Sequence, residues 1–232
     1  RSVKGLARSG GGEQFAYRSY ARLLFMYAKV VLDLDPEPFD GALASAKADR
    51  GVGDDSELDA AAWKRLCREY KSAIRSETRR PFPQDPRAQL RAAVDAVFRS
   101  WNGARAIAYR EREHISHDLG TAVNVQAMVF GNRDDDSGTG VAFTRNAATG
   151  EDVPYGDFLL NAQGEDVVAG VRITEPLSAL GERFPDLHAQ LLGHMHEMEA
   201  HYRDMLDLEF TIEQGTLWML QARVGKRTGA AA

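Results

Sequence analysis

The sequence predicts an α+β fold, with a helical first half followed by antiparallel β hairpins and a helix. Apolar residues recur at helical spacing in several stretches of the first half. After Gly120 the chain becomes rich in β-branched and turn-forming residues. Near the end, two β-rich stretches flank a short turn that contains Gly215. We therefore expect a mainly helical subdomain at residues 1–118 and an α+β subdomain at residues 119–232.

Three long helices are predicted in the first subdomain. The first covers about residues 13–34, where apolar side chains follow the helical period. The second begins near Ser56 and Asp59, which form a helix-start pattern. Its apolar side carries Leu58, Ala62, Leu66, Tyr70 and Ile74. Asp85 and Pro86 are an N-cap and first-turn pair that starts the third helix. Its apolar side carries Leu90, Val94, Val97, Phe98 and Trp101.

The second subdomain is expected to contain hairpins on both sides of a helix. Residues 121–131 and 141–145 have the composition of two strands that pair around a long turn-forming loop. Residues 155–160 are predicted to form a further strand. A helix is expected at about residues 179–202, with an interruption near Pro185. The final hairpin follows this helix.

The composition excludes several classes of protein. The chain has 34 acidic and 29 basic side chains among its 232 residues, a formal net charge of -5, which argues against a surface that coats nucleic acid. Its single cysteine, Cys67, cannot form an internal disulfide, and no CxxC pair is present to hold zinc. No apolar run has the length of a membrane helix. We expect a cytoplasmic protein with neither a nucleic-acid nor a membrane partner.

The final hairpin carries the most informative polar residues. Asp207 and Glu209 are two positions apart in a β-rich stretch, so their carboxylates point to one side of a strand. The returning stretch carries Gln221 and Arg223, also two positions apart. A two-residue turn would place Gln221 on the opposite face, whereas a three-residue loop over residues 213–215 would bring all four side chains together. We predict the three-residue loop.

Such a set of oxygen ligands suits Mg²⁺, which takes carboxylate and amide oxygens and is usually completed by phosphate and water. Arg223 could then neutralise phosphate oxygens with its planar guanidinium group. A surface hairpin whose charges are merely solvated remains the alternative, because amphipathic hairpins are common.

Two other stretches are candidate binding segments. In residues 137–146, Gly138 and Gly140 flank Thr139, and such a glycine-rich hairpin tip could cover phosphates through backbone N–H groups and the threonine hydroxyl. An ordinary flexible turn is the alternative. Residues 161–170, which include Glu165 and Asp166, form a polar cluster that is typical either of a binding loop or of a simple connection.

The histidines and tryptophans are assigned structural roles. His194 and His196 lie in the predicted helix without HExxH spacing, so we interpret them as surface residues rather than metal ligands. The three tryptophans, Trp63, Trp101 and Trp218, are predicted to be core aromatics.

The same stretches, in order, resemble the pyruvate, phosphate dikinase family of phosphoenolpyruvate-utilising enzymes. The similar blocks are QFAYRSYARLLFMYAKVV, AVFRSWNGARAIAYR, GTAVNVQAMVFGN, SGTGVAFTRNAATGE, LLNAQGEDVVAG and HYRDMLDLEFTIEQGTLWMLQARVGKRT. They cover nearly the whole chain, although residues 40–86 match less distinctly. Several long blocks in a fixed order are far more specific than a short glycine pattern.

The resemblance implies an ATP-grasp fold, in which two α+β subdomains hold ATP between them. It implies that Asp207, Glu209 and Gln221 bind Mg²⁺ and take part in catalysis, and that Arg223 binds phosphate. It further implies a nucleotide-binding set in which backbone atoms receive adenine, a loop covers the phosphates and one further polar residue contributes. The members of this set are Gln126, Met128 and Val129 for adenine, Thr139 and Gly140 for the phosphates, and Glu165.

The family reaction converts ATP, pyruvate and phosphate to AMP, phosphoenolpyruvate and pyrophosphate. The resemblance therefore implies ATP, inorganic phosphate and a swivelling phosphohistidine domain as partners, and a homo-oligomeric full enzyme. Because the family's phosphate-gripping lysine and arginine would precede Arg1, and its histidine domain would follow Ala232, we expect this chain alone to be inactive. The alternatives are a noncatalytic nucleotide-binding or regulatory remnant of the same fold, a phosphoenolpyruvate synthase-like enzyme, and a helical interaction protein without a ligand.

Overall fold

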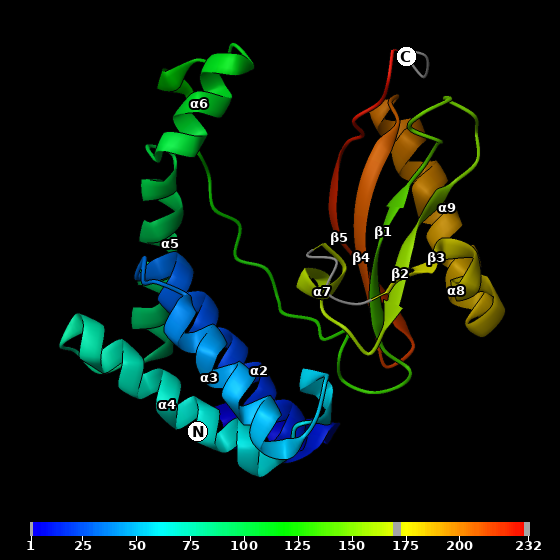
Figure 1. Cartoon of the computed structure of the whole chain (residues 1–232). Helices are drawn as coiled ribbons and strands as arrows, with labels where there is room; N and C mark the ends of the chain where they lie inside the picture. The colour runs from blue at the N-terminus through cyan, green and yellow to red at the C-terminus, as the bar shows by residue number, and fades with distance from the viewer. Residues whose placement is uncertain (1, 169–172, 230–232) are drawn as a thin grey trace. The chain divides into compact units, whose positions relative to one another are not determined.

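The computed structural model describes residues 2–168 and 173–229. The chain divides into two compact units, Arg1–Gln126 and Ala127–Ala232 (Figure 1). The first is helical, and the second contains an antiparallel sheet with helices. The predicted α+β class is therefore confirmed.

The described part of the first unit consists of helices and their connections. The α-helices are α1 (Ser2–Leu6), α2 (Gly12–Met26), α3 (Glu37–Arg50), α4 (Ala60–Thr78), α5 (Pro86–Ser100) and α6 (Ala104–Arg112). Short helical turns are η1 (Ala7–Gly11), η2 (Tyr27–Val31), η3 (Asp55–Glu57) and η4 (His117–Leu119). The three predicted helices correspond to α2 with η2, to α4 and to α5.

The third predicted helix begins at its predicted cap, whereas α4 begins after Asp59 and not at Ser56, which lies in η3. The Asp59 carboxylate accepts a hydrogen bond from the backbone N–H of Ala62 at 2.7 Å and so caps α4. The Asp85 carboxylate accepts one from the N–H of Arg87 at 3.2 Å and caps α5, whose first residue is Pro86. In both cases a side-chain oxygen satisfies a donor that has no partner within the helix.

The apolar side of α4 is buried, whereas that of α5 is not. All five apolar positions predicted for the second helix are at most 4% exposed. In α5, Leu90, Val97 and Phe98 are 47%, 38% and 49% exposed, and only Ala96 is buried. The helical spacing of apolar residues correctly predicts that α5 is a helix, but tertiary contacts decide which of its sides is buried.

The thiol of Cys67 is enclosed in the core of the first unit. It donates a hydrogen bond to the Tyr17 carbonyl at 3.4 Å, and burial raises its pKa to about 12. Because the thiolate is the reactive form, we expect iodoacetamide at pH 8 to leave Cys67 unmodified in the folded protein and to alkylate it in denaturant. Mass spectrometry after a timed reaction measures this. Stoichiometric alkylation of the folded chain would contradict it.

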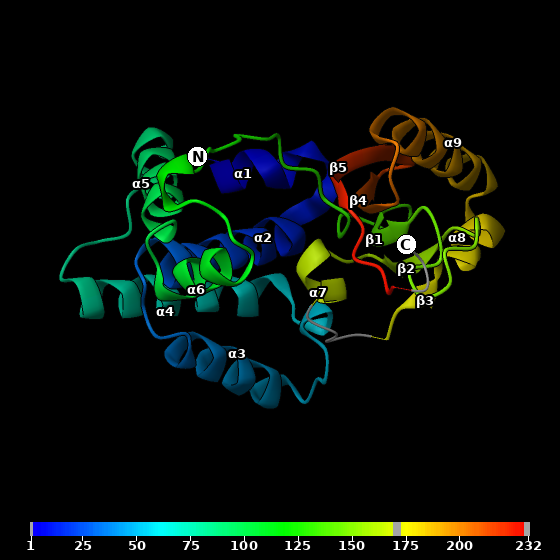
Figure 2. The ribbon, with the colours of Figure 1, turned by 90° about the horizontal axis from the view of Figure 1, so that it is seen from above.

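The second unit is built on a five-stranded antiparallel sheet in the order β3-β2-β1-β4-β5. The strands are β1 (Gly138–Phe143), β2 (Tyr155–Leu160), β3 (Glu175–Pro176), β4 (Leu206–Glu213) and β5 (Thr216–Val224). The helices are α7 (Gly164–Val168), α8 (Leu177–Arg183) and α9 (Pro185–Tyr202). Figures 1 and 2 show α8 and α9 on one side of the sheet and α7 on the other. The break between α8 and α9 lies at Phe184, next to Pro185, as predicted.

The core of this unit lies between the sheet and the α8–α9 pair. Alternate residues of β4 face it, and Leu191 and Met195 of α9 are buried against them. The β4 residues in this core are Leu206, Leu208, Phe210 and Ile212, each at most 1% exposed. The opposite face of β4 carries the remaining, polar residues.

The predicted strand at residues 121–131 does not form. This stretch has no strand pairing among the described residues, and Val125 and Met128 are 69% and 71% exposed. Its expected partner, β1, pairs with β2 along one edge and with β4 along the other. Since a strand has only two edges, no edge of β1 is left for residues 121–131. The predicted first hairpin was therefore wrong.

Candidate functional site

One face of β4 carries a row of polar side chains. Asp207, Glu209, Thr211 and Glu213 alternate with the four core residues and therefore point away from α8 and α9. Asp207 is 8% exposed, Thr211 is 3% exposed, and Glu209 is half-buried. Their side chains lie on a sheltered face of the sheet rather than at a fully exposed edge.

The register of β4 and β5 places the predicted polar partners opposite each other. Asp207 is opposite Arg223, and Glu209 is opposite Gln221. The Nε of Arg223 donates to Oδ2 of Asp207 at 2.7 Å. The Arg223 side chain remains 59% exposed while that of Asp207 is 11% exposed, so the guanidinium keeps donors directed to solvent. The predicted grouping of these four residues is confirmed.

The turn that produces this grouping differs from the predicted one. Glu213 pairs with Thr216, so the turn contains only Gln214 and Gly215, with φ values of 50° and 72°. Positive φ at both central residues is typical of a type I′ hairpin. The predicted three-residue loop was wrong.

A β-bulge restores the alignment that a two-residue turn would otherwise lose. The register shifts between Glu209 and Phe210, which pair with Gln221 and Met219, so Leu220 is the extra residue. The pairing of β4 with β1 is uninterrupted through the same positions, which assigns the bulge to β5. A bulge places two residues of one strand opposite one residue of the other.

Because of the bulge, the parts of β5 before and after Leu220 both direct apolar side chains into the core. Leu217 and Met219 pack against the core before it, and Ala222 packs against the core after it. The core-facing positions therefore change from odd to even numbers across Leu220. This change of parity is visible in the sequence TLWMLQARV and is the signal that sequence analysis missed.

The glycine-rich stretch lies in the centre of the sheet instead of at a hairpin tip. Gly138, Thr139 and Gly140 belong to β1, between β2 and β4. Thr139 is 2% exposed, and its hydroxyl donates to the Phe210 carbonyl at 3.0 Å and lies 3.1 Å from the Thr211 hydroxyl. The location predicted for this stretch, a loop, was wrong.

The two glycines of β1 have a packing role. A Cβ at Gly140 would lie 2.6 Å from the Phe210 ring, and one at Gly138 would lie 2.6 Å from the Phe158 ring. The two phenylalanines are parallel, with ring centroids 6.3 Å apart. Glycine is thus required at both positions because aromatic rings occupy the space of a side chain.

The remaining predicted residues lie on other segments. Glu165 is exposed on α7, which contacts β1 and β2. Met128 is 71% exposed and Val129 is half-buried, both in the second unit, whereas Gln126 is the last residue of the first. Residues 169 and 170 of the predicted polar cluster lie outside the described residues.

The donor set on β4 and β5 suits a magnesium ion that also binds phosphate. Within residues 2–168 and 173–229, no group of three or more His, Cys, Asp or Glu side chains is arranged to hold a metal ion by itself. Mg²⁺ usually takes one or two carboxylates and keeps phosphate and water oxygens as further ligands. Asp207, Glu209 and the amide oxygen of Gln221 provide such a partial set.

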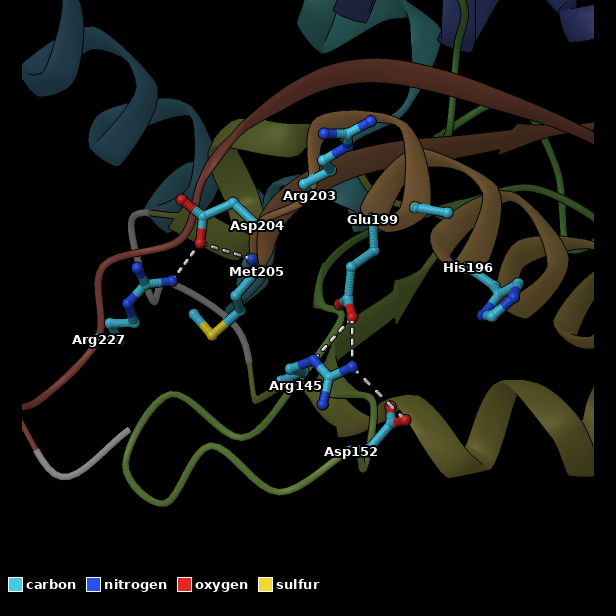
Figure 3. A pocket seen from close by; sticks show the side chains of 9 residues that line it. Arg145, Asp152, His196, Glu199, Arg203, Asp204, Met205 and Arg227 are labelled. Carbon is cyan, nitrogen blue, oxygen red and sulfur yellow. Dashed lines mark hydrogen bonds and ion pairs between the residues drawn. The ribbon is translucent and has the colours of Figure 1, made fainter. Parts of the chain in front are cut away.

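A separate cavity of about 470 Å³ lies where α9, the β1–β2 connection and the segment after β5 meet. Arg145 lies between Glu199 and Asp152, at 2.6 and 3.6 Å, and Arg227 forms an ion pair with Asp204 (Figure 3). Glu199 raises the pKa of Arg145, and Arg227 lowers the pKa of Asp204. None of the predicted site residues lines this cavity. Its ion pairs connect three chain segments.

The aromatic and histidine predictions have mixed outcomes. Trp63 is 2% exposed, but Trp218 is 47% exposed on β5, so its assignment to the core was wrong. Trp101 is half-buried beneath the Arg110 guanidinium, which lies 3.9 Å from its ring centroid. His194 and His196 lie on the surface of α9, as predicted.

None of the described helices is both long enough and apolar enough to cross a membrane.

Comparison with known proteins matches residues 53–178 to the family described as "Pyruvate phosphate dikinase, AMP/ATP-binding domain". Pyruvate, phosphate dikinase of Clostridium symbiosum is 48% identical over 232 residues, which are 100% of this chain and 26% of that protein. Chloroplastic pyruvate, phosphate dikinase 1 of Oryza sativa is 49% identical over 228 residues, 98% of this chain and 24% of that protein. The enzyme of Rhizobium meliloti is 48% identical over 244 residues, 100% of this chain and 27% of that protein. The chain spans about a quarter of the length of these relatives.

Proposed function

Because the chain belongs to the family of pyruvate phosphate dikinase AMP/ATP-binding domains, we propose that the polar face of β4 and β5 binds MgATP and orients its phosphoryl groups for transfer. The observation that carries this proposal is the register that places Asp207 opposite Arg223 and Glu209 opposite Gln221. A bulge maintains this register although the turn alone would not.

The residues of this face have complementary roles in the proposal. Asp207, Glu209 and the Gln221 amide oxygen hold Mg²⁺, which neutralises the charge of phosphate oxygens when it is bound. Arg223 donates to the same phosphates through the donors that Asp207 leaves free, and its fork can bind two oxygens at once. Phosphoryl transfer has a loose transition state, so positioning and charge neutralisation suffice and no side-chain nucleophile is needed here.

The base and the remaining phosphate contacts come from other segments. We place adenine against backbone groups of Gln126, Met128 and Val129, and we assign Glu165 to the polar edge of the nucleotide site. Because the Thr139 hydroxyl already has two partners in the sheet, Thr139 and Gly140 contribute by shaping the floor of the site. This differs from the phosphate-covering loop that the sequence suggests.

The relatives are longer than this chain, so we propose the wider activity for a longer protein that contains it. We propose that it converts ATP, pyruvate and phosphate to AMP, phosphoenolpyruvate and pyrophosphate, as a cytoplasmic homo-oligomer in which a phosphohistidine domain receives the phosphoryl group. The support is the identity of 48–49% to dikinases about four times as long as this chain. The chain by itself is then expected to bind nucleotide without turnover.

Calorimetric titration with ATP, with and without Mg²⁺, tests the proposed site. We expect binding that depends on Mg²⁺ and that Glu209→Ala weakens by about 10- to 100-fold, because one metal ligand and its charge are lost. Glu197→Gln is a matched control, since that carboxylate is 79% exposed on α9. Equal binding by the unsubstituted chain and Glu209→Ala would refute the assigned site, and a helical interaction protein without a ligand would bind no MgATP.

A further inference from the structure

Glu213, at the end of β4, binds a segment that is distant in the sequence. Its Oε2 accepts a hydrogen bond from the backbone N–H of Phe130 at 3.2 Å, and its Oε1 accepts one from the Arg133 guanidinium. Both charged side chains are only 14% exposed. A carboxylate that is this sheltered and charge-paired holds its partners more firmly than a surface ion pair does.

Further contacts fasten the same segment, which we call the 130–137 loop. The Gln214 N–H donates to the Ser137 hydroxyl at 3.1 Å, and the Gly215 N–H donates to the Asp136 carbonyl at 3.0 Å. The Ser137 hydroxyl in turn donates to Asp134 at 2.6 Å. The hairpin turn and Glu213 therefore hold the loop from one side.

The loop is also held from the side of β2. The Ala162 N–H donates to the Gly131 carbonyl at 3.0 Å. A Cβ at Gly131 would lie 2.4 Å from the Ala162 carbonyl and 2.6 Å from that of Gly138. This close backbone approach leaves the start of the loop little room to shift.

The position of Glu213 relates this anchor to the polar face. Glu213 is on the same side of β4 as Asp207 and Glu209, and four residues beyond Glu209. At a rise of about 3.3 Å per residue, the two carboxylates are about 13 Å apart along the strand. An extended nucleoside triphosphate spans a similar distance from its base to its terminal phosphates. Met128 and Val129 directly precede the anchored loop.

We propose that Glu213 is a positioning residue that fixes the backbone of Met128 and Val129 relative to Asp207 and Glu209, and so sets the affinity for the adenosine part of ATP. This inference rests on the proposed function. The strand β4 then carries two metal ligands toward one end and the anchor of the base-binding segment at the other. Nothing in this arrangement requires Glu213 to touch the nucleotide.

Binding of two ligands distinguishes positioning from a general structural role. We expect Glu213→Ala to weaken MgATP binding about tenfold or more, because a charge-assisted anchor is lost. Binding of magnesium tripolyphosphate, which has no base, should change less than about twofold. Glu213→Gln keeps an acceptor for the Phe130 N–H and should restore part of the affinity. Equal loss of both ligands, or loss of neither, would overturn the proposal.

Hydrogen exchange without nucleotide tests the anchor independently. In Glu213→Ala we expect amide exchange of residues 128–133 to accelerate about tenfold or more, while β1 and β4 remain protected. Glu197→Gln should change neither. Unchanged exchange in residues 128–133 would overturn the anchor itself. Failure of the unsubstituted chain to bind MgATP would instead overturn the proposed function, and with it the role in nucleotide affinity.

Discussion

Replacing Phe210 with alanine is expected to destabilise the second unit by about 3–5 kcal/mol, the usual cost of removing a buried phenylalanine. Phe210 is fully buried between the sheet and α9, and its ring lies over Gly140 and beside Phe158. The substitution leaves a cavity that neither neighbour can fill, because Gly140 has no side chain and Phe158 is held in its own strand. Denaturant unfolding, monitored by hydrogen exchange in residues 127–229, measures the decrease in the free energy of unfolding.

Trp218→Ala provides the comparison for this prediction. Trp218 is a larger aromatic residue on the same sheet, but it is 47% exposed on β5. Its removal should cost less than about 1 kcal/mol, since surface substitutions have small effects. Similar costs for Phe210→Ala and Trp218→Ala would show that the core is not where the structure places it.

Gly156→Ala is expected to be comparably damaging, at about 3 kcal/mol or more, although it adds a single methyl group. In β2, a Cβ at Gly156 would lie 2.0 Å from the Val141 carbonyl oxygen and 2.8 Å from the Ala142 Cα. Both atoms are backbone of the central strand, so the clash requires β1 and β2 to separate. Overpacking usually costs about 1–3 kcal/mol, and more where the neighbours cannot move.

Gly193→Ala is the matched control, because the same methyl group is added where there is space. Gly193 is exposed within α9, and its Cβ would have no neighbour within 4 Å. Alanine there should stabilise the unit by about 0.5–1 kcal/mol through its higher helix propensity. Thermal unfolding of both variants gives the sign and size of each effect. Destabilisation by both would point to an effect of β-carbon addition unrelated to strand packing.

Helices were predictable where their signals are local. Asp85 caps α5 as expected, because a cap depends on residues two or three positions away. Asp59 caps α4, a few residues after the predicted start at Ser56. Burial was less predictable. The apolar sides of α4 and α5 look alike in sequence, yet only that of α4 is covered, because the covering residues come from distant segments.

Strand pairing was the main failure of sequence analysis. Residues 121–131 have a strand-like composition, but both edges of β1 are occupied by strands that follow later in the chain. The composition of a segment indicates that it can form a strand, but it does not indicate which strand edge is free to pair with it. The same limit explains Gly138 and Gly140, which were interpreted as a flexible tip and instead lie beneath aromatic rings.

The polar face was predicted with the correct neighbours but with the wrong turn. Glu209 and Gln221 are opposite each other because Leu220 bulges, not because the loop has an odd number of residues. Inferring strand faces from an odd or even number of loop residues assumes regular strands. One extra residue in a strand moves the side chains beyond it to the opposite face. Glu213 was also missed, although it continues the alternation of Asp207, Glu209 and Thr211, because its partners lie far away in the sequence.

The place of β1 between β2 and β4 has a consequence for the rate of folding. The β4–β5 hairpin closes through a two-residue turn, which is a local and fast event. Pairing of β1 with β4 instead requires closure of residues 144–205, which include β2 and α7 to α9. Docking of the preformed hairpin onto β1 is therefore the expected slow step. The pairs Asp207–Arg223 and Glu209–Gln221 lie within the hairpin and form early, whereas the pairing of Val141 with Glu209 forms only at this docking step.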